Sequence, residues 1–188
     1  MTPRMYSPNR MTTNTQPKQV AKLPIVLIGM MGVGKSTVGR RLASRLNIPF
    51  VDADTEIETA AGLTVAEIFE RFGEQHFRDG ERRVIARLID GTRKVIATGG
   101  GAFMQSDTRE LILNNATTIW LQADIQTLVQ RVGRRGDRPL LADRDPETVL
   151  RELAEVRNPV YALAPLHVFS HPAPHEATVD AILKELRA

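Results

Sequence analysis

The residues best suited to do chemistry form a glycine-rich segment close to the start of the chain. Residues 29–36 read G-M-M-G-V-G-K-S and match the pattern G-x-x-x-x-G-K-[ST]. Glycines allow a backbone to wrap closely around phosphate groups and to turn its N–H groups inward. Lys35 can reach the β- and γ-phosphates of a nucleotide, and the Ser36 hydroxyl can ligate Mg²⁺. The pattern therefore predicts a P-loop, a binding site for nucleotide phosphates.

The sequence on either side of this loop predicts the elements that must hold it. Residues 24–28 form a continuous apolar run that ends at Gly29, which predicts a buried strand. Residues 36–46 are apolar at helical spacing, and a helix that begins there directs its positive end at a bound anion. P-loops also occur in switches, motors and DNA-handling ATPases, so the loop alone does not define the reaction.

Two carboxylates follow the next predicted strand, residues 48–51. A spacing of two puts Asp52 and Asp54 on the same side of an extended segment. One carboxylate can then hold the Mg²⁺ shell while the other accepts a proton from a hydroxyl nucleophile. The alternative is that Asp54 caps a helix over residues 55–61.

Two further groups have a functional and a purely structural interpretation. Arg78 and Glu81 face each other on a predicted helix, either as a surface ion pair or as an arginine that a carboxylate aims at an acidic substrate. The glycines of residues 99–101 follow a predicted strand over residues 94–97. They either allow close backbone approach to a ligand or form a loose turn.

An arginine-rich segment lies between two predicted helices, and we expect it to form a lid over about residues 131–146. A kinase needs a lid that excludes water, and it needs cations near the phosphoryl group in transfer. The alternative is a solvated charged loop. The arginines are Arg131, Arg134, Arg135, Arg138 and Arg144.

The remaining pattern alternates strands with helices. Thr64 and Glu67 predict a capping box, and Asp124 predicts a helix cap. Further helices are expected over residues 65–72, 74–89, 147–157 and 177–186, the third ending before Pro159, and further strands over residues 117–121 and 166–169. The fold class is therefore α/β, a three-layer open parallel sheet with helices on both faces. Ligands bind such sheets at the carboxyl ends of the strands, which places the loops after Ile28, Val51 and Ala97 on one rim.

Composition narrows the class of protein further. The chain has 188 residues, 42% of them hydrophobic, and no cysteine, which excludes disulfides and thiolate metal sites. No apolar run approaches the roughly 20 residues that span a bilayer, so we expect no membrane partner. The net charge is +3, but basic residues are neither striped nor interleaved with aromatic ones, so we expect no nucleic-acid partner.

The first residues differ in composition from the rest. Residues 1–22 hold basic side chains, no acid and no apolar periodicity, which predicts a disordered basic extension before a single domain over residues 23–188. A transit peptide is the alternative, whereas the apolar segment of a secretory signal is missing. We expect a cytoplasmic protein.

Taken together, these segments resemble the shikimate kinase family from Leu23 to the C-terminus. The matching segments are G-M-M-G-V-G-K-S-T at 29–37, F-V-D-A-D at 50–54, E-I-F-E-R-F-G-E at 67–74, F-R-D-G-E at 77–81, T-G-G-G at 98–101, R-P-L-L at 138–141 and R-N-P-V-Y at 157–161. Only the P-loop is specific by itself, but the joint order and spacing are highly specific.

The resemblance implies a nucleoside-monophosphate-kinase-like fold with a five-stranded parallel sheet. It also implies transfer of the ATP γ-phosphate to the 3-hydroxyl of shikimate, a step toward chorismate and the aromatic amino acids. ATP is the co-substrate, Mg²⁺ the cofactor, and the enzyme is expected to be a monomer.

The resemblance also implies a role for each matching residue. Asp54 would bind the shikimate hydroxyls and act as the base or orienter, and Asp52 would contact Mg²⁺ through water beside Ser36. Arg78 and Arg157 would bind the carboxylate of shikimate, while Arg138 would close over the phosphates of ATP. The catalytic set is Asp54, Lys35 and Arg138; the ATP-binding set is Gly32, Val33, Gly34, Lys35, Ser36, Thr37 and Arg138; and the substrate-binding set is Asp54, Arg78, Gly99, Gly100, Gly101 and Arg157.

Two stretches depart from the family pattern. Either Arg131 or Arg134 fits the arginine that stacks on adenine. Residues 170–175 show no clear adenine loop, and we interpret them as a solvent-exposed loop, because His171 and His175 alone are too few ligands for a metal. The rival interpretations of the whole chain are a related small-molecule kinase, such as gluconate kinase, and a non-catalytic nucleotide-binding regulator. The regulator should have lost Asp54, Arg78 or Arg157.

Overall fold

A computed structural model describes residues 22–133, 144–170 and 174–187. The expected extension over residues 1–22, except Lys22, lies outside the described residues. So do Arg134, Arg138 and most of the expected lid.

Five parallel strands form one sheet in the order β2-β3-β1-β4-β5. They are β1 (Ile25–Ile28), β2 (Phe50–Asp52), β3 (Val95–Ala97), β4 (Thr117–Gln122) and β5 (Leu166–Phe169). Val26, in the central strand, lies beside Ile96 on one side and Thr118 on the other. Every residue of β1 is buried, as expected of a strand with helices above and below it.

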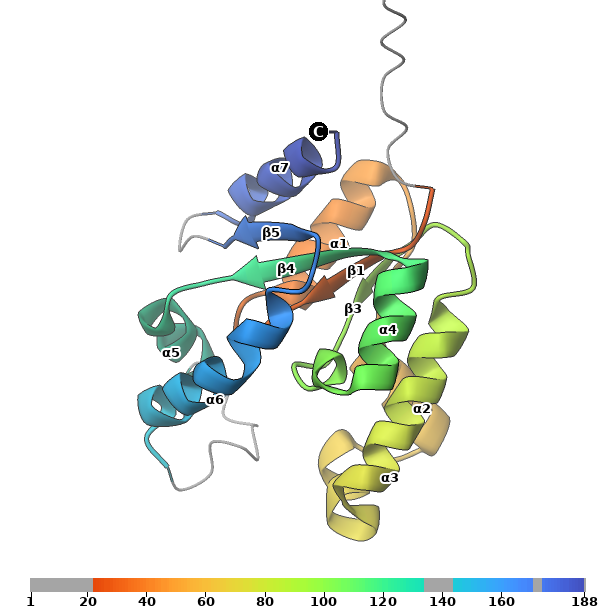
Figure 1. Ribbon diagram of the computed structural model, residues 1–188, viewed down its shortest axis with the longest axis vertical. Helices are drawn as coiled ribbons and strands as arrows, with labels where there is room; N and C mark the ends of the chain where they lie inside the picture. The colour runs from red at the N-terminus through yellow and green to blue at the C-terminus, as the bar shows by residue number, and fades with distance from the viewer. Residues whose placement is uncertain (1–21, 134–143, 171–173, 188) are drawn as a thin grey trace, which may run out of the picture.

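Helices cover both faces of this sheet. They are α1 (Lys35–Leu46), α2 (Ala53–Ala61), α3 (Val65–Leu88), α4 (Ser106–Asn115), α5 (Ile125–Gly133), α6 (Pro146–Tyr161) and α7 (His175–Glu185), with a 3₁₀ turn η1 (Ala102–Met104). Helices α1 and α7 lie together on one face, and α3 and α4 lie on the other (Figure 1). The predicted three-layer α/β architecture with five parallel strands is confirmed.

Local sequence explains several helix ends. Thr64 and Glu67 form the predicted capping box at the start of α3. Asp124 accepts a hydrogen bond from the N–H of Thr127 and caps α5, also as predicted. The two helices expected over residues 65–72 and 74–89 are the two halves of α3. A kink separates them at Gly73, whose φ of 80° is not helical.

Two helices differ from expectation. No helix was expected over residues 106–115, where α4 forms, since its polar residues mask the periodicity and only Thr108 and Ile112 are buried. Helix α6 was expected to end before Pro159, yet it continues to Tyr161. Pro159 removes one backbone N–H donor from the helix. The helix nevertheless continues, and its last residue, Tyr161, is buried in the core.

Candidate active site

The P-loop connects β1 to α1, and its glycines meet strict geometric demands. Gly29, Gly32 and Gly34 have φ values of 138°, 80° and 101°. L-residues with side chains rarely adopt such values. A Cβ at Gly29 would overlap the carbonyl oxygen of Leu121, and one at Gly32 would lie 2.8 Å from a methyl carbon of Val132. The loop is therefore packed against β4 and α5 in a shape that requires glycine.

Lys35 lies over this loop and opens α1. Its Nζ donates hydrogen bonds to the carbonyl oxygens of Gly29, at 2.8 Å, and Met30, at 3.1 Å. The helix begins at Lys35, one residue earlier than expected, and no side chain caps its N-terminus. The N-terminus of α1 is thus suited to an anion.

Asp52 and Ser36 join the P-loop to the end of β2. The Ser36 hydroxyl donates to Asp52 Oδ2 at 2.6 Å, and Asp52 Oδ1 accepts the N–H of Asp54 at 3.1 Å. Asp52 is therefore the N-cap of α2, and the alternative in which Asp54 caps the helix is wrong. The extended segment expected to carry both carboxylates is also wrong, because Asp54 lies in the first turn of α2.

The environment of Asp54 favours its protonated form. Burial is the main cause that raises its pKa, and the nearby charge of Asp52 adds to it. The positive charges of Lys35 and Arg78 act in the opposite direction without cancelling the shift.

Arg78 and Glu81 form a mostly buried ion pair rather than a surface one. Their atoms Nη1 and Oε2 are 2.6 Å apart, and the side chains are 13% and 1% exposed. The guanidinium also lies 5.1 Å from the ring centroid of Phe77. Burial raises the pKa of Glu81 more than the neighbouring Arg78 lowers it. The second carboxylate oxygen of Glu81, Oε1, has no hydrogen-bond partner among the described residues.

The glycines after β3 lie where these groups meet. A Cβ at Gly99 would be 2.9 Å from Asp54 Oδ1 and 3.0 Å from Glu81 Oε1. A Cβ at Gly100 would be 3.1 Å from the Arg157 guanidinium, and one at Gly101 would overlap that of Arg78. The glycines thus form a close-packed wall and not a loose turn.

Arg131 links the P-loop to the end of β5. Its Nη1 donates to the carbonyl oxygen of Val33 at 3.0 Å and to the Ser170 hydroxyl at 3.2 Å. Ser170 is fully buried, and His175 is partly buried at the start of α7. The expectation that residues 170–175 form a solvent-exposed loop is therefore wrong at Ser170 and at His175, which lies in α7, whereas Pro174 is exposed.

His175 lies beside the P-loop. A Cβ at Gly34 would be 3.6 Å from its Cε1, and its Nδ1 is buried with no partner among the described residues. Burial lowers the pKa of His175, and the charges of Arg131 and Arg41 lower it further. Sequence patterns gave no functional signal for His175, because its neighbours come from other elements.

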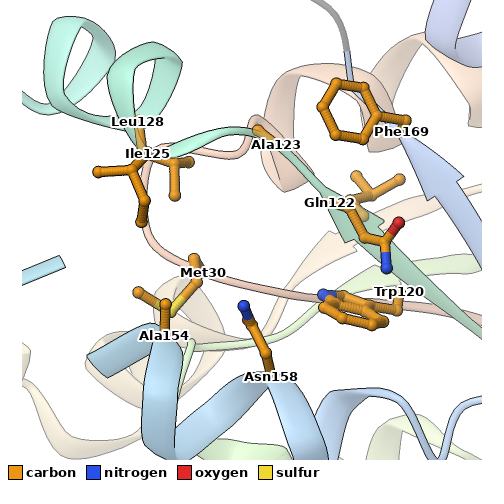
Figure 2. A pocket seen from close by; sticks show the side chains of 10 residues that line it. Met30, Trp120, Gln122, Ala123, Ile125, Leu128, Ala154, Asn158 and Phe169 are labelled. Atoms are coloured by element: carbon orange, nitrogen blue, oxygen red, sulfur yellow. The ribbon is translucent and has the colours of Figure 1, made fainter. Parts of the chain in front are cut away.

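A small hollow lies next to the phosphate loop (Figure 2). Its volume is about 140 Å³, and its walls come from Met30, the end of β4 and helices α5 and α6. The side chains of Trp120 and Asn158 line it, whereas Lys35, Ser36 and Asp54 do not. The hollow is therefore separate from the acids and arginines described above.

A P-loop on a parallel sheet, with an acidic pair and two arginines on the same rim, defines a P-loop kinase. The family model for shikimate kinase matches residues 31–187. The shikimate kinase of Zymomonas mobilis is 60% identical over 162 residues, 86% of this chain and 92% of that protein. That of Bradyrhizobium diazoefficiens is 59% identical over 87% of this chain and 79% of that protein. The chain belongs to the shikimate kinase family, as its resemblance predicted.

Solved structures agree with this assignment. Shikimate kinase from Acinetobacter baumannii, in complex with shikimate, has a TM-score of 0.83 at 37% identity, covering 87% of this chain and 92% of that one. A gluconokinase from Sinorhizobium meliloti has a TM-score of 0.58 at 19% identity, covering 88% of this chain and 91% of that one, and shares the fold alone. The gluconate kinase alternative is thus the more distant one.

Proposed function

We propose that this protein transfers the γ-phosphoryl group of ATP to the 3-hydroxyl of shikimate, giving shikimate 3-phosphate and ADP on the route to chorismate. The observation that carries the proposal is the wall of residues 99–101, which lies against Asp54 and Glu81 at Gly99, against Arg157 at Gly100 and against Arg78 at Gly101. A ligand against this wall meets a proton acceptor and two guanidinium groups. Shikimate has the matching chemistry, with several hydroxyls and one carboxylate.

Arg78 and Arg157 are proposed to bind the carboxylate. A guanidinium offers donors in a planar fork that matches the two oxygens of a carboxylate. Glu81 supports this role because it holds Arg78 through a 2.6 Å charged hydrogen bond. The backbone of residues 99–101 would contact the ring of the substrate.

Asp54 is proposed to accept the proton of the attacking hydroxyl. Its raised pKa makes it a better proton acceptor than an ordinary aspartate, since basicity rises with pKa. Lys35 and Arg138 would stabilise negative charge on the transferring group, so catalysis is mainly positioning and electrostatics, with no covalent intermediate.

The residues at the P-loop fit Mg²⁺. Ser36 Oγ and Asp52 Oδ2 are hard oxygen ligands that lie 2.6 Å apart. Among the described residues, no group of three or more His, Cys, Asp or Glu side chains could hold a metal ion. Mg²⁺ suits such a sparse site because it keeps several waters and binds substrate phosphates. When bound, it would offset phosphate charge, with Ser36 as direct ligand and Asp52 acting through water.

The nucleotide would lie along the P-loop, in contact with Gly32, Val33, Gly34, Ser36 and Thr37. Of the two arginines considered for stacking on adenine, we favour Arg131, because it already contacts the loop at Val33. We also infer a cytoplasmic enzyme, since the reaction consumes ATP, and a monomer, as the resemblance to the family implies. No helix in the described part of the chain is long and apolar enough to cross a membrane.

Product analysis tests the proposal. Purified protein is incubated with ATP, Mg²⁺ and shikimate, and the product is examined by ³¹P and proton NMR. Coupling of the new phosphorus to the proton at C3 is expected, and no product should form when a chelator removes the metal. Phosphorylation of another hydroxyl would contradict the assigned placement of Asp54.

A further inference from the structure

Tyr161 is a buried tyrosine at the end of α6 whose hydroxyl reaches the active-site wall. The side chain is 0% exposed, and its ring lies between Phe103, at 6.5 Å, and Trp120, at 6.0 Å between centroids. The hydroxyl donates a hydrogen bond to the carbonyl oxygen of Gly100. A buried hydroxyl needs such a partner, but this partner belongs to the glycine wall.

The positive charge of Arg157 also acts on this hydroxyl. Arg157 lies one helical turn before Tyr161, so the two side chains share one face of α6. Burial raises the pKa of Tyr161, while the positive charge of Arg157 lowers it less. The phenol therefore stays protonated at neutral pH and donates to the Gly100 carbonyl.

This arrangement fixes the orientation of the Gly100 peptide, whose carbonyl oxygen accepts from Tyr161. Gly100 is flanked by Gly99 and Gly101, so the residues on either side supply no side chain to hold this peptide. A carbonyl oxygen carries partial negative charge, so a Gly100 carbonyl that swung toward Arg157 would compete with a substrate anion for the guanidinium. In a trans peptide the C=O and N–H groups point in opposite directions. With the carbonyl held by Tyr161, the N–H of Gly101 points away from that side.

We propose that Tyr161 is a positioning residue for the substrate: its hydroxyl fixes the Gly100 peptide beside the Arg157 guanidinium, in the orientation that receives the carboxylate. The inference rests on the proposed function, because it assigns the carboxylate to Arg157. It makes Tyr161 a part of substrate binding through other groups, without direct contact.

Tyr161→Phe tests this role because it keeps the ring and removes only the hydroxyl. We expect the KM for shikimate to rise about tenfold, the size of effect given by the loss of one or two hydrogen bonds near a charged group. The KM for ATP should stay within about twofold. Phe103→Leu is the matched control, since it loosens the packing of the same ring; it should lower the melting temperature without a selective change for shikimate.

Combination with Arg157→Lys tests the coupling. In that background Tyr161→Phe should raise the KM for shikimate by less than about threefold, because the group that it positions is already altered. An undiminished tenfold penalty there would overturn the coupling. An unchanged KM in the single variant, or equal losses for both substrates, would overturn the positioning role. A wild-type protein without shikimate-dependent ADP release would instead refute the proposed function itself.

Discussion

The phosphate side of the site, residues 29–36 with Asp52, is one continuous loop with one added carboxylate, whereas the carboxylate side is assembled from three separate segments. Lys35 bonds to the carbonyl oxygens of Gly29 and Met30 within its own loop. The carboxylate side consists of Arg78, Glu81, Gly99–Gly101, Arg157 and Tyr161, which come from α3, the loop after β3, and α6. The phosphate side thus depends on the backbone shape of one loop packed against β4 and α5, and the carboxylate side on how three separate segments are placed together.

This difference has a consequence for substitutions. Changes on the carboxylate side should alter the binding of shikimate and leave the nucleotide largely unaffected. Asp54 stands between the two sides, since both Lys35 and Arg78 act on its pKa. It is therefore the residue at which the two sides should be hardest to separate.

The largest effect is expected for Asp54→Asn. Loss of the proton acceptor should lower kcat by about 10²–10⁴-fold, the range typical of general acid–base groups. ATP binding should survive because the P-loop contacts do not involve this side chain. Steady-state kinetics and titration with a fluorescent ATP analogue measure the two effects. Unchanged turnover, or loss of nucleotide binding, would refute the role assigned to Asp54.

Arg157→Ala should act on one side only. A hydrogen bond to a charged group contributes about 1.5–3 kcal/mol, so the KM for shikimate should rise by roughly 10- to 150-fold. The KM for ATP should change little. Arg151→Ala is the matched control, because Arg151 lies on the same helix and pairs with Glu147 at the surface. A change in the KM for ATP alone would contradict the division of the site into a phosphate side and a carboxylate side.

Glu81→Gln should give a smaller change of the same kind. The variant keeps the shape but removes the charge that holds Arg78, so the KM for shikimate should rise by about five- to tenfold. Glu74→Gln is the control, since Glu74 is an exposed partner of the same arginine at 3.3 Å, and exposed pairs contribute little. Equal kinetics for the two variants would show that burial of the pair has no functional importance.

The smallest effect concerns stability. The folded-state pKa of Asp54 lies above its ordinary value of 3.8, so the folded state binds this proton more tightly than the unfolded state. The stability that the Asp54 carboxyl contributes is therefore lost as the pH rises from its ordinary pKa through its raised folded-state pKa. Asp54→Asn should raise the melting temperature of the ligand-free protein at neutral pH by a few degrees, since about 1 kcal/mol shifts it by roughly 2–4 °C in a chain of this size.

Thermal unfolding of both proteins across the pH range checks this expectation. The difference should shrink as the pH falls and the wild-type carboxyl takes up its proton. Asp79→Asn, at an exposed carboxylate on α3, serves as the control. A variant less stable than the wild type at neutral pH would contradict the burial argument for Asp54.

Sequence patterns predicted the features that depend on near neighbours. The P-loop, the capping box at Thr64 and the pairing of Arg78 with Glu81 each follow from spacings of a few residues, and the structure has all three. The order of strands and helices followed from alternating apolar runs. These features need no knowledge of how distant segments meet.

Contacts between distant segments were not predictable in the same way. No spacing indicates that Tyr161 bonds to Gly100, or that Ser170 is buried against Arg131. The continuation of α6 past Pro159 depends on tertiary packing, which local rules omit. The sequence named Asp54 only as an alternative cap and did not indicate Asp52, which caps α2, because helix starts are uncertain by one or two residues.

ADP release from ATP and Mg²⁺ is the most direct test of the central claim, measured with shikimate, with gluconate and with neither. Strong stimulation by shikimate alone is the predicted result, and it would establish both the reaction and the substrate. Equal or greater stimulation by gluconate, or none by either compound while ATP still binds, would leave the P-loop intact as a nucleotide site and contradict the assignment of shikimate.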